Sequence, residues 1–184
     1  MQKGVLKICA RLVTILKKIS SLILNYFWEN NMLTLENLSK YDEKLASDYA
    51  MDLFHKGFTC AETIMYTLNK HLDMRLDEKS FSMCSGFPWG LGGGGCICGA
   101  LAGSSMIIGT EFGRKSFDET RDDNCFSINK ELHDEFKKVN GGTCCRVLMH
   151  GLDRDDPKRK ENCSNYVRNA LKITVDLLKK YKKV

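Results

Sequence analysis

The segment from Cys98 to Gly109, which reads CGALAGSSMIIG, contains no charged residue and is apolar on nearly every side of a helix. A helix without a polar face has to be buried on all sides. Its small residues, including Gly99 and Gly103, would let other helices pass close to it. The sequence therefore predicts a protein built around one buried, glycine- and alanine-rich helix.

Helical patterns also occur on both sides of this segment, and no segment shows the sustained two-residue alternation of a β-strand. We therefore predict an all-α fold, a compact bundle of about five to seven helices around the buried one. The expected helices cover residues 41–55, residues 60–71, a short stretch after Asp77, residues 119–138, a short stretch near Thr143, and a final helix that ends near Lys180. We expect a cysteine-rich helical domain over residues 39–184, preceded by an N-terminal helix and linker over residues 1–38.

Residues 5–28 form an amphipathic pattern with a basic face and no acidic residue. Such a helix can lie on an anionic membrane surface, or it can pack on the domain or on a second copy in a homodimer. A third interpretation is that these residues precede the true start of the protein, at Met32. No run of the chain reaches the roughly 18–20 apolar residues that a membrane-spanning helix needs.

Charge and cysteine content limit the classes of function. Five of the 28 basic residues precede Glu29, so the rest of the chain has 23 basic and 23 acidic residues. This balance argues against a nucleic-acid-binding surface. Nine cysteines without a clear cleavable signal favour a cytoplasmic location, where clustered thiols usually indicate metal or redox chemistry.

Four positions place cysteines near predicted helix starts. Cys60 lies inside the capping box that Thr59 and Glu62 form. Cys98 stands where a glycine-rich loop enters the buried helix. The remaining candidates are Cys144 and Cys145 after Thr143, and Cys163 after Asn162. Asp156-Pro157 is a competing helix start, and a helix that begins there would place Cys163 in its middle.

Helix N-termini present unpaired N–H groups and a partial positive charge. Both favour thiolate over thiol, and both would stabilise a negatively charged iron–sulfur cluster. The alternative reading of any single cysteine is that of a small buried apolar residue. We apply this reading to Cys9, Cys84 and Cys125, whereas Cys96 and Cys144 remain ambiguous. Neither a P-loop motif nor a CxxC pair is present.

Four segments resemble the C_GCAxxG_C_C family of redox-active proteins. They are GFTCAETIM at residues 57–65, the glycine loop with CGALAGSSMIIG at 98–109, CCRVL at 144–148 and CSNYVRNA at 163–170. The resemblance covers roughly residues 39–178 and implies four characteristic cysteines, Cys60, Cys98, Cys145 and Cys163. The literal GCAxxG string is absent, and cysteines 84, 96, 125 and 144 are additional.

These observations lead to one main functional hypothesis and two alternatives. The main hypothesis is that Cys60, Cys98, Cys145 and Cys163 bind an iron–sulfur cluster, with Gly95 and Gly99 letting the backbone approach it. The protein would then carry electrons to or from a redox partner protein and have no substrate of its own. The alternatives are metal-free thiol–disulfide chemistry, with Cys98 attacking and Cys96 or Cys145 resolving, and a structural zinc site.

Overall fold

The computed structural model describes residues 14–20 and 33–183. The chain divides into two units, residues 1–32 and residues 33–184, which are treated separately. In the first unit residues 14–20 are helical, and the rest of the predicted helix over residues 5–28 lies outside the described residues. Its contact with a membrane or a second copy stays a prediction. Among the described residues, no helix is both long and apolar enough to cross a membrane.

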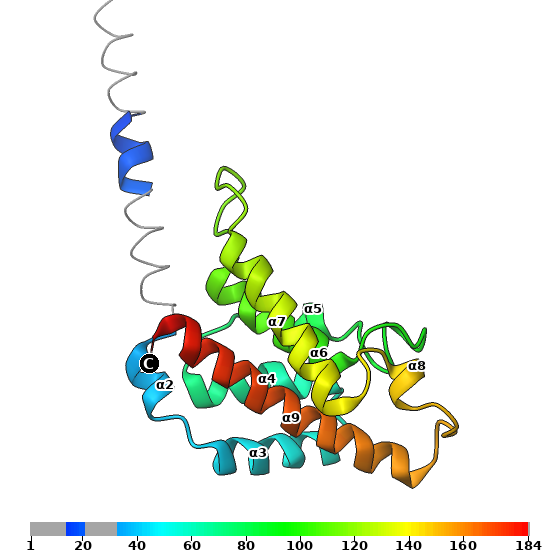
Figure 1. The fold of residues 1–184 in the computed structure, drawn as a ribbon. Coiled ribbons are helices and arrows are strands. Elements are labelled where there is room, and N and C mark those ends of the chain that lie inside the picture. Colours follow the sequence, from blue (N-terminus) through cyan, green and yellow to red (C-terminus); the bar gives the residue numbers. More distant parts are fainter. Residues whose placement is uncertain (1–13, 21–32, 184) are drawn as a thin grey trace, which may run out of the picture. The chain divides into compact units, whose positions relative to one another are not determined.

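The second unit consists of helices joined by turns and loops (Figure 1). No residue of the described part of the chain belongs to a strand, so the all-α prediction is confirmed. The helices are α2 (Leu35–Ser39), α3 (Glu43–His55), α4 (Cys60–Leu72), α5 (Glu78–Cys84), α6 (Gly99–Phe112), α7 (Asp123–Asn140), α8 (Cys145–Leu148) and α9 (Pro157–Lys182).

Helix α6 is the predicted buried helix, and it packs against α4, α7 and α9. Both of its helix-facing glycines are in close contact with α4. A Cβ atom on Gly103 would lie 2.8 Å from the carbonyl oxygen of Ala61, and one on Gly99 would lie 3.2 Å from the Cβ of Cys60. The absence of side chains at these positions brings the first turn of α4 against α6.

Polar side chains fix where most helices begin. Thr59 and Glu62 form the predicted capping box at the start of α4. Helix α9 begins at the earlier of its two predicted starts, because Asp156 caps the helix and Pro157 is its first residue. The prediction that Cys163 lies at a helix start is therefore wrong, since this residue lies in the second turn of α9.

The core extends to residues that precede position 39. Leu33 and Leu38 are buried in the same core as residues of α4, α6, α7 and α9. The short helix α2, which the sequence pattern did not predict, is capped by Thr34. The Asn37 side chain donates to the carbonyl oxygen of Leu72 at the end of α4 (3.0 Å). These contacts attach the segment before α3 to the bundle.

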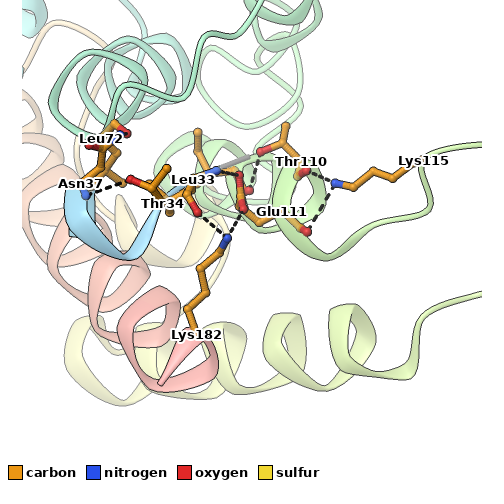
Figure 2. A network of polar contacts seen from close by, with 9 residues as sticks. Leu33, Thr34, Asn37, Leu72, Thr110, Glu111, Lys115 and Lys182 are labelled. Carbon is orange, nitrogen blue, oxygen red and sulfur yellow. Dashed lines mark hydrogen bonds and ion pairs between the residues drawn. The ribbon is translucent and has the colours of Figure 1, made fainter. Parts of the chain in front are cut away.

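A buried ion pair joins the ends of α6 and α9 to this segment (Figure 2). The Lys182 ammonium lies 2.7 Å from Glu111 Oε2 and also donates to the carbonyl oxygen of Leu33 (2.7 Å). The Leu33 N–H in turn donates to Glu111 Oε1 (3.1 Å). The side chains of Lys182 and Glu111 are only 13% and 2% exposed.

Removing the cation of this pair is expected to destabilise the protein. In Lys182→Met the carboxylate of Glu111 would stay buried without its cation, and the free energy of unfolding should fall by about 3–5 kcal/mol. Lys172 provides a control on the same helix, because its ion pair with Asp176 is exposed. Lys172→Met should cost less than about 1 kcal/mol. Urea unfolding of the two variants measures both values, and equal losses would contradict this prediction.

Candidate redox site

Four elements bring the predicted cysteines to one region. Cys60 is the first residue of α4, Cys98 is the N-cap of α6, and Cys145 is the first residue of α8. Cys163 comes from the second turn of α9. The four thiols interact most strongly in two pairs, Cys60 with Cys163 and Cys98 with Cys145, because within each pair one thiol shifts the pKa of the other.

The glycine loop between α5 and α6 brings Cys98 to α8. The Cys98 N–H donates to the carbonyl oxygen of Thr143 (2.7 Å), and the Arg146 N–H donates to the carbonyl oxygen of Gly95 (3.0 Å). The loop turns tightly, and at Gly90 a Cβ atom would lie 2.8 Å from the carbonyl oxygen of Cys96. These contacts hold the loop against the start of α8, which sets the Cys98–Cys145 pair.

The second pair depends on the packing of α4 with α9 and of α8 with α9. Gly99 allows the start of α6 to approach Cys60, as its close contact with that side chain shows. The Tyr166 hydroxyl of α9 donates to the carbonyl oxygen of Leu148 at the end of α8 (3.3 Å). Cys163 lies one turn before Tyr166 on α9. The three helix starts and α9 are therefore held together around the thiols.

The two pairs also influence each other electrically. The pKa of Cys60 is raised well above its ordinary value by its hydrogen bond to Cys163, by burial, and by the nearby sulfurs of Cys163, Cys98 and Cys145. The pKa of Tyr166 is raised by burial and then by Cys163, Cys98 and Cys145. A negative charge on any one of these sulfurs is thus felt by its neighbours, so the four thiols form one coupled site.

Within this site Cys145 and Cys163 are the thiols that favour the thiolate. The hydrogen bond from Cys98 lowers the pKa of Cys145 to about 7, although burial opposes it, and the Gly99 N–H and the charge of Arg159 assist. The pKa of Cys163 is lowered by its hydrogen bond to Cys60 and by Arg159, while burial and the sulfur of Cys145 oppose the shift.

The pKa of Cys98, which was predicted to be the attacking thiol, shifts in the opposite direction from the pKa of Cys145. Its hydrogen bond to Cys145 and its burial raise its pKa well above the ordinary value. The N–H groups of Ala100 and Leu101 lower that pKa, but the Cys98 thiol makes no capping hydrogen bond. Cys145 is therefore the better nucleophile of the pair at neutral pH.

This difference predicts the pH dependence of alkylation. A thiol reacts as its thiolate, whose fraction rises with pH through the pKa. In reduced, metal-free protein, Cys145 should reach half of its maximal rate near pH 7. The buried Cys84 is an internal control, because burial raises its pKa to about 11. Pulsed alkylation followed by mass spectrometry measures both residues in one sample, and a midpoint for Cys145 above pH 9 would contradict the expected pKa.

A cavity of about 200 Å³ opens onto the site. Three of the four cysteines line it, together with the Gly99 backbone and one arginine, Arg159. Its other walls are mainly aromatic and include Phe54, Phe58, Phe87 and Trp89. The cavity is therefore a mostly apolar chamber with sulfur atoms on one wall.

Arg159 belongs to the site although the sequence interpretation missed it. It precedes Cys163 by four residues on α9, so the two side chains share one face of the helix. Its positive charge lowers the pKa of both Cys145 and Cys163. The four-residue spacing of Arg159 and Cys163 is present in the sequence. It places the two side chains on one helix face only if α9 begins at Pro157 and not at Cys163.

The remaining described cysteines do not belong to either pair. Cys84 is buried and its thiol donates to the carbonyl oxygen of Phe81 (2.9 Å). Cys96 is exposed, and Cys125 is half-buried with a raised pKa, caused mainly by burial. Cys144 is the N-cap of α8 and is half-buried. Cys9 lies outside the described residues.

In the part of the chain that the structure describes, no group of three or more His, Cys, Asp or Glu side chains is disposed to hold a metal ion. Gly99 directs its N–H toward Cys145. Gly95 instead contacts Arg146, because a Cβ atom added to Gly95 would lie 3.1 Å from the Cβ atom of Arg146. Of the two glycines predicted to approach a cofactor, Gly99 is the one that lies directly against the thiols.

Comparison with known proteins agrees with this cysteine pattern. A protein of Archaeoglobus fulgidus, named only as an uncharacterized protein, is 26% identical over 140 residues, which cover 72% of this chain and 93% of the relative. No solved structure matches the chain. The family model described as "Putative redox-active protein (C_GCAxxG_C_C)" matches residues 58–177, a span that contains all four paired cysteines. The chain therefore belongs to the C_GCAxxG_C_C family of redox-active proteins.

Proposed function

We propose that this protein is an electron carrier in which Cys60, Cys98, Cys145 and Cys163 hold a 2Fe–2S cluster, two thiolates on each iron. The observation that carries the proposal is the arrangement of the thiols as two adjacent, electrically coupled pairs. A 2Fe–2S centre takes four cysteine ligands, and its two irons are ligated by separate pairs of side chains. When bound, the cluster supplies reversible one-electron transfer.

The surrounding groups suit a negatively charged sulfur site. The Gly99 N–H faces Cys145, and the Ala100 and Leu101 N–H groups face Cys98. The guanidinium of Arg159 adds a positive charge next to Cys145 and Cys163. Such donors and charges lower the free energy of thiolate ligands and tune a reduction potential.

The aromatic walls have a separate role. Phe54, Phe58 and Phe87 are half-buried around the cavity and limit the access of water to the sulfurs. Trp89 is 49% exposed and contacts both the cavity and solvent. Exposure of a cluster to solvent is one of the factors that set its potential. We therefore assign to these side chains the protection of the sulfurs, and to the Trp89 face the approach of a partner protein.

Metal and sulfide analysis tests this proposal directly. Full-length protein purified without oxygen should contain about two irons and two acid-labile sulfides per chain. One-electron reduction should produce a paramagnetic signal. Protein without iron and sulfide, after reconstitution with both has also failed, would overturn the proposal. About one zinc per chain would favour a structural site instead, which needs all four sulfurs around a single ion.

Thiol–disulfide exchange is the second candidate function, and the low pKa of Cys145 favours it. In this chemistry the Cys145 thiolate attacks a disulfide of a partner, and one partner sulfur leaves as a thiolate. The Cys98 sulfur, after loss of its proton, then attacks the mixed disulfide. The products are a Cys98–Cys145 disulfide and a partner dithiol, so two electrons pass to the partner. Metal-free protein that reversibly loses about two hydrogens in mass on oxidation would support this function.

A further inference from the structure

A second cavity, of about 400 Å³, borders Cys145 and has a different chemical lining. Arginine and histidine side chains and the glycine loop form its walls, and no carboxylate is among the lining residues. The charged and ring-bearing lining residues are Trp89, Arg146, His150, Arg154 and Arg159. Its volume lies within the roughly 300–1,000 Å³ that is typical of small-molecule sites.

Contacts other than carboxylate ion pairs hold the three guanidinium groups in place. Arg146 donates to the carbonyl oxygen of Gly94 (2.7 Å), and Arg154 stacks over the Trp89 ring, 4.4 Å from its centroid. Arg159 donates through Nη1 to a backbone carbonyl oxygen (3.4 Å), and its Nε is buried without a hydrogen-bond partner. Across residues 14–20 and 33–183, none of the three forms an ion pair with a carboxylate.

Two acidic side chains that follow Arg154 in the chain line a neighbouring cavity. Asp155 and Asp156 line that cavity, of about 390 Å³, which shares Arg154 and Arg159 with the arginine-lined one. Asp156 is occupied as the cap of α9, where its carboxylate accepts from the Lys158 N–H (2.8 Å). The arginine-lined cavity therefore keeps a surplus of positive charge.

We propose that the arginine-lined cavity binds a small oxyanion, namely a ligand that presents a carboxylate, phosphate or sulfur oxyanion group, directly beside Cys145. Guanidinium groups match such planar or tetrahedral anions with two parallel hydrogen bonds. The stacking of Arg154 on Trp89 pre-orients one guanidinium of the lining. The arginines and the cavity are present whichever redox chemistry the cysteines perform, so the site would bind the oxyanion in both cases.

The charge selectivity of alkylation at Cys145 tests this site. Iodoacetate is an anion and iodoacetamide is neutral, and in both reactions the thiolate sulfur forms a bond to carbon while iodide leaves. The ratio of the two rates cancels the thiolate fraction, so the pKa of Cys145 does not enter. In reduced, metal-free, full-length protein, this ratio should exceed that of free cysteine by about tenfold or more. Sulfate or inorganic phosphate should reduce the ratio by occupying the cavity.

Matched arginine variants locate the effect. Arg154→Gln should lower the rate ratio at least about threefold, because it removes one of three charges around the anion. Arg168→Gln removes the same charge from an exposed side chain of α9 that lines none of these cavities, and it should leave the ratio unchanged. Arg146→Gln serves as the second variant if circular dichroism shows that Arg154→Gln does not fold.

The outcomes separate this inference from the proposed function. A ratio equal to that of free cysteine, or one that neither arginine variant changes, would overturn the oxyanion site. The absence of iron would leave the result intact, because the assay uses metal-free protein. Calorimetric titration with inorganic phosphate provides a direct measurement, and the heat of binding should be lost in the Arg154→Gln variant and kept in the Arg168→Gln variant.

Discussion

Replacing Gly103 with alanine should lower the free energy of unfolding by about 1–3 kcal/mol, which is the usual cost of adding a methyl group to a packed interior. The new Cβ would lie 2.8 Å from the Ala61 carbonyl oxygen and 3.1 Å from the Ile64 Cβ. Backbone atoms of α4 cannot turn away, so the two helices would have to separate. Because alanine is intrinsically the better helix former by about 1 kcal/mol, a loss of stability would demonstrate the tertiary contact.

Gly109 provides the control on the same helix. A Cβ at this position would meet nothing within 4 Å, so Gly109→Ala should stabilise the protein by up to about 1 kcal/mol. Urea unfolding followed by circular dichroism gives both values. The prediction is contradicted if Gly103→Ala and Gly109→Ala change the free energy of unfolding in the same direction. Since Ala61 follows Cys60, Gly103→Ala should also reduce the iron content of protein purified without oxygen.

The central helix and most helix starts could be predicted because local signals determine them. The uncharged stretch after Cys98 has no polar face, and the box of Thr59 and Glu62 satisfies the first N–H groups of its own helix. The start of α9 could not be decided in this way. Both Asn162 and Asp156 are good caps, and the proline after Asp156 favours the earlier start.

The fold places the four cysteines of the family pattern near one another, but the contacts among them could not be predicted from the sequence. The four cysteines predicted from the family pattern are the four that the fold brings together. Which thiol pairs with which depends on contacts between distant segments, such as the bond from the Cys98 N–H to Thr143. The pKa difference within the Cys98–Cys145 pair could not be predicted for the same reason, because the pKa of Cys145 reflects its partner Cys98 and the distant Arg159.

Loss of one paired cysteine is expected to abolish the redox centre, and the extra cysteines provide matched controls. If the proposed cluster is present, Cys98→Ser and Cys145→Ser should reduce iron and sulfide to below about one tenth of the wild-type content, since each would remove one of the four proposed ligands. Cys96→Ser and Cys144→Ser change neighbouring cysteines outside the two pairs and should retain both. Anaerobic purification with iron and sulfide analysis checks all four variants. A loss of iron in Cys96→Ser would mean that the loop, and not the pair, supplies the ligand.

The same pairs predict a second effect that needs no metal. The hydrogen bond from Cys98 is the largest cause of the low pKa of Cys145, so Cys98→Ala should move that pKa from about 7 toward the ordinary value for a thiol. The alkylation rate of Cys145 at pH 7 should fall accordingly. By the same reasoning Cys60→Ala should raise the pKa of Cys163, whose thiolate Cys60 stabilises, and should not produce the large change at Cys145. A similar slowing of Cys145 in both variants would indicate one undivided group of four thiols, whereas a selective effect would establish the two pairs as the working units of the site.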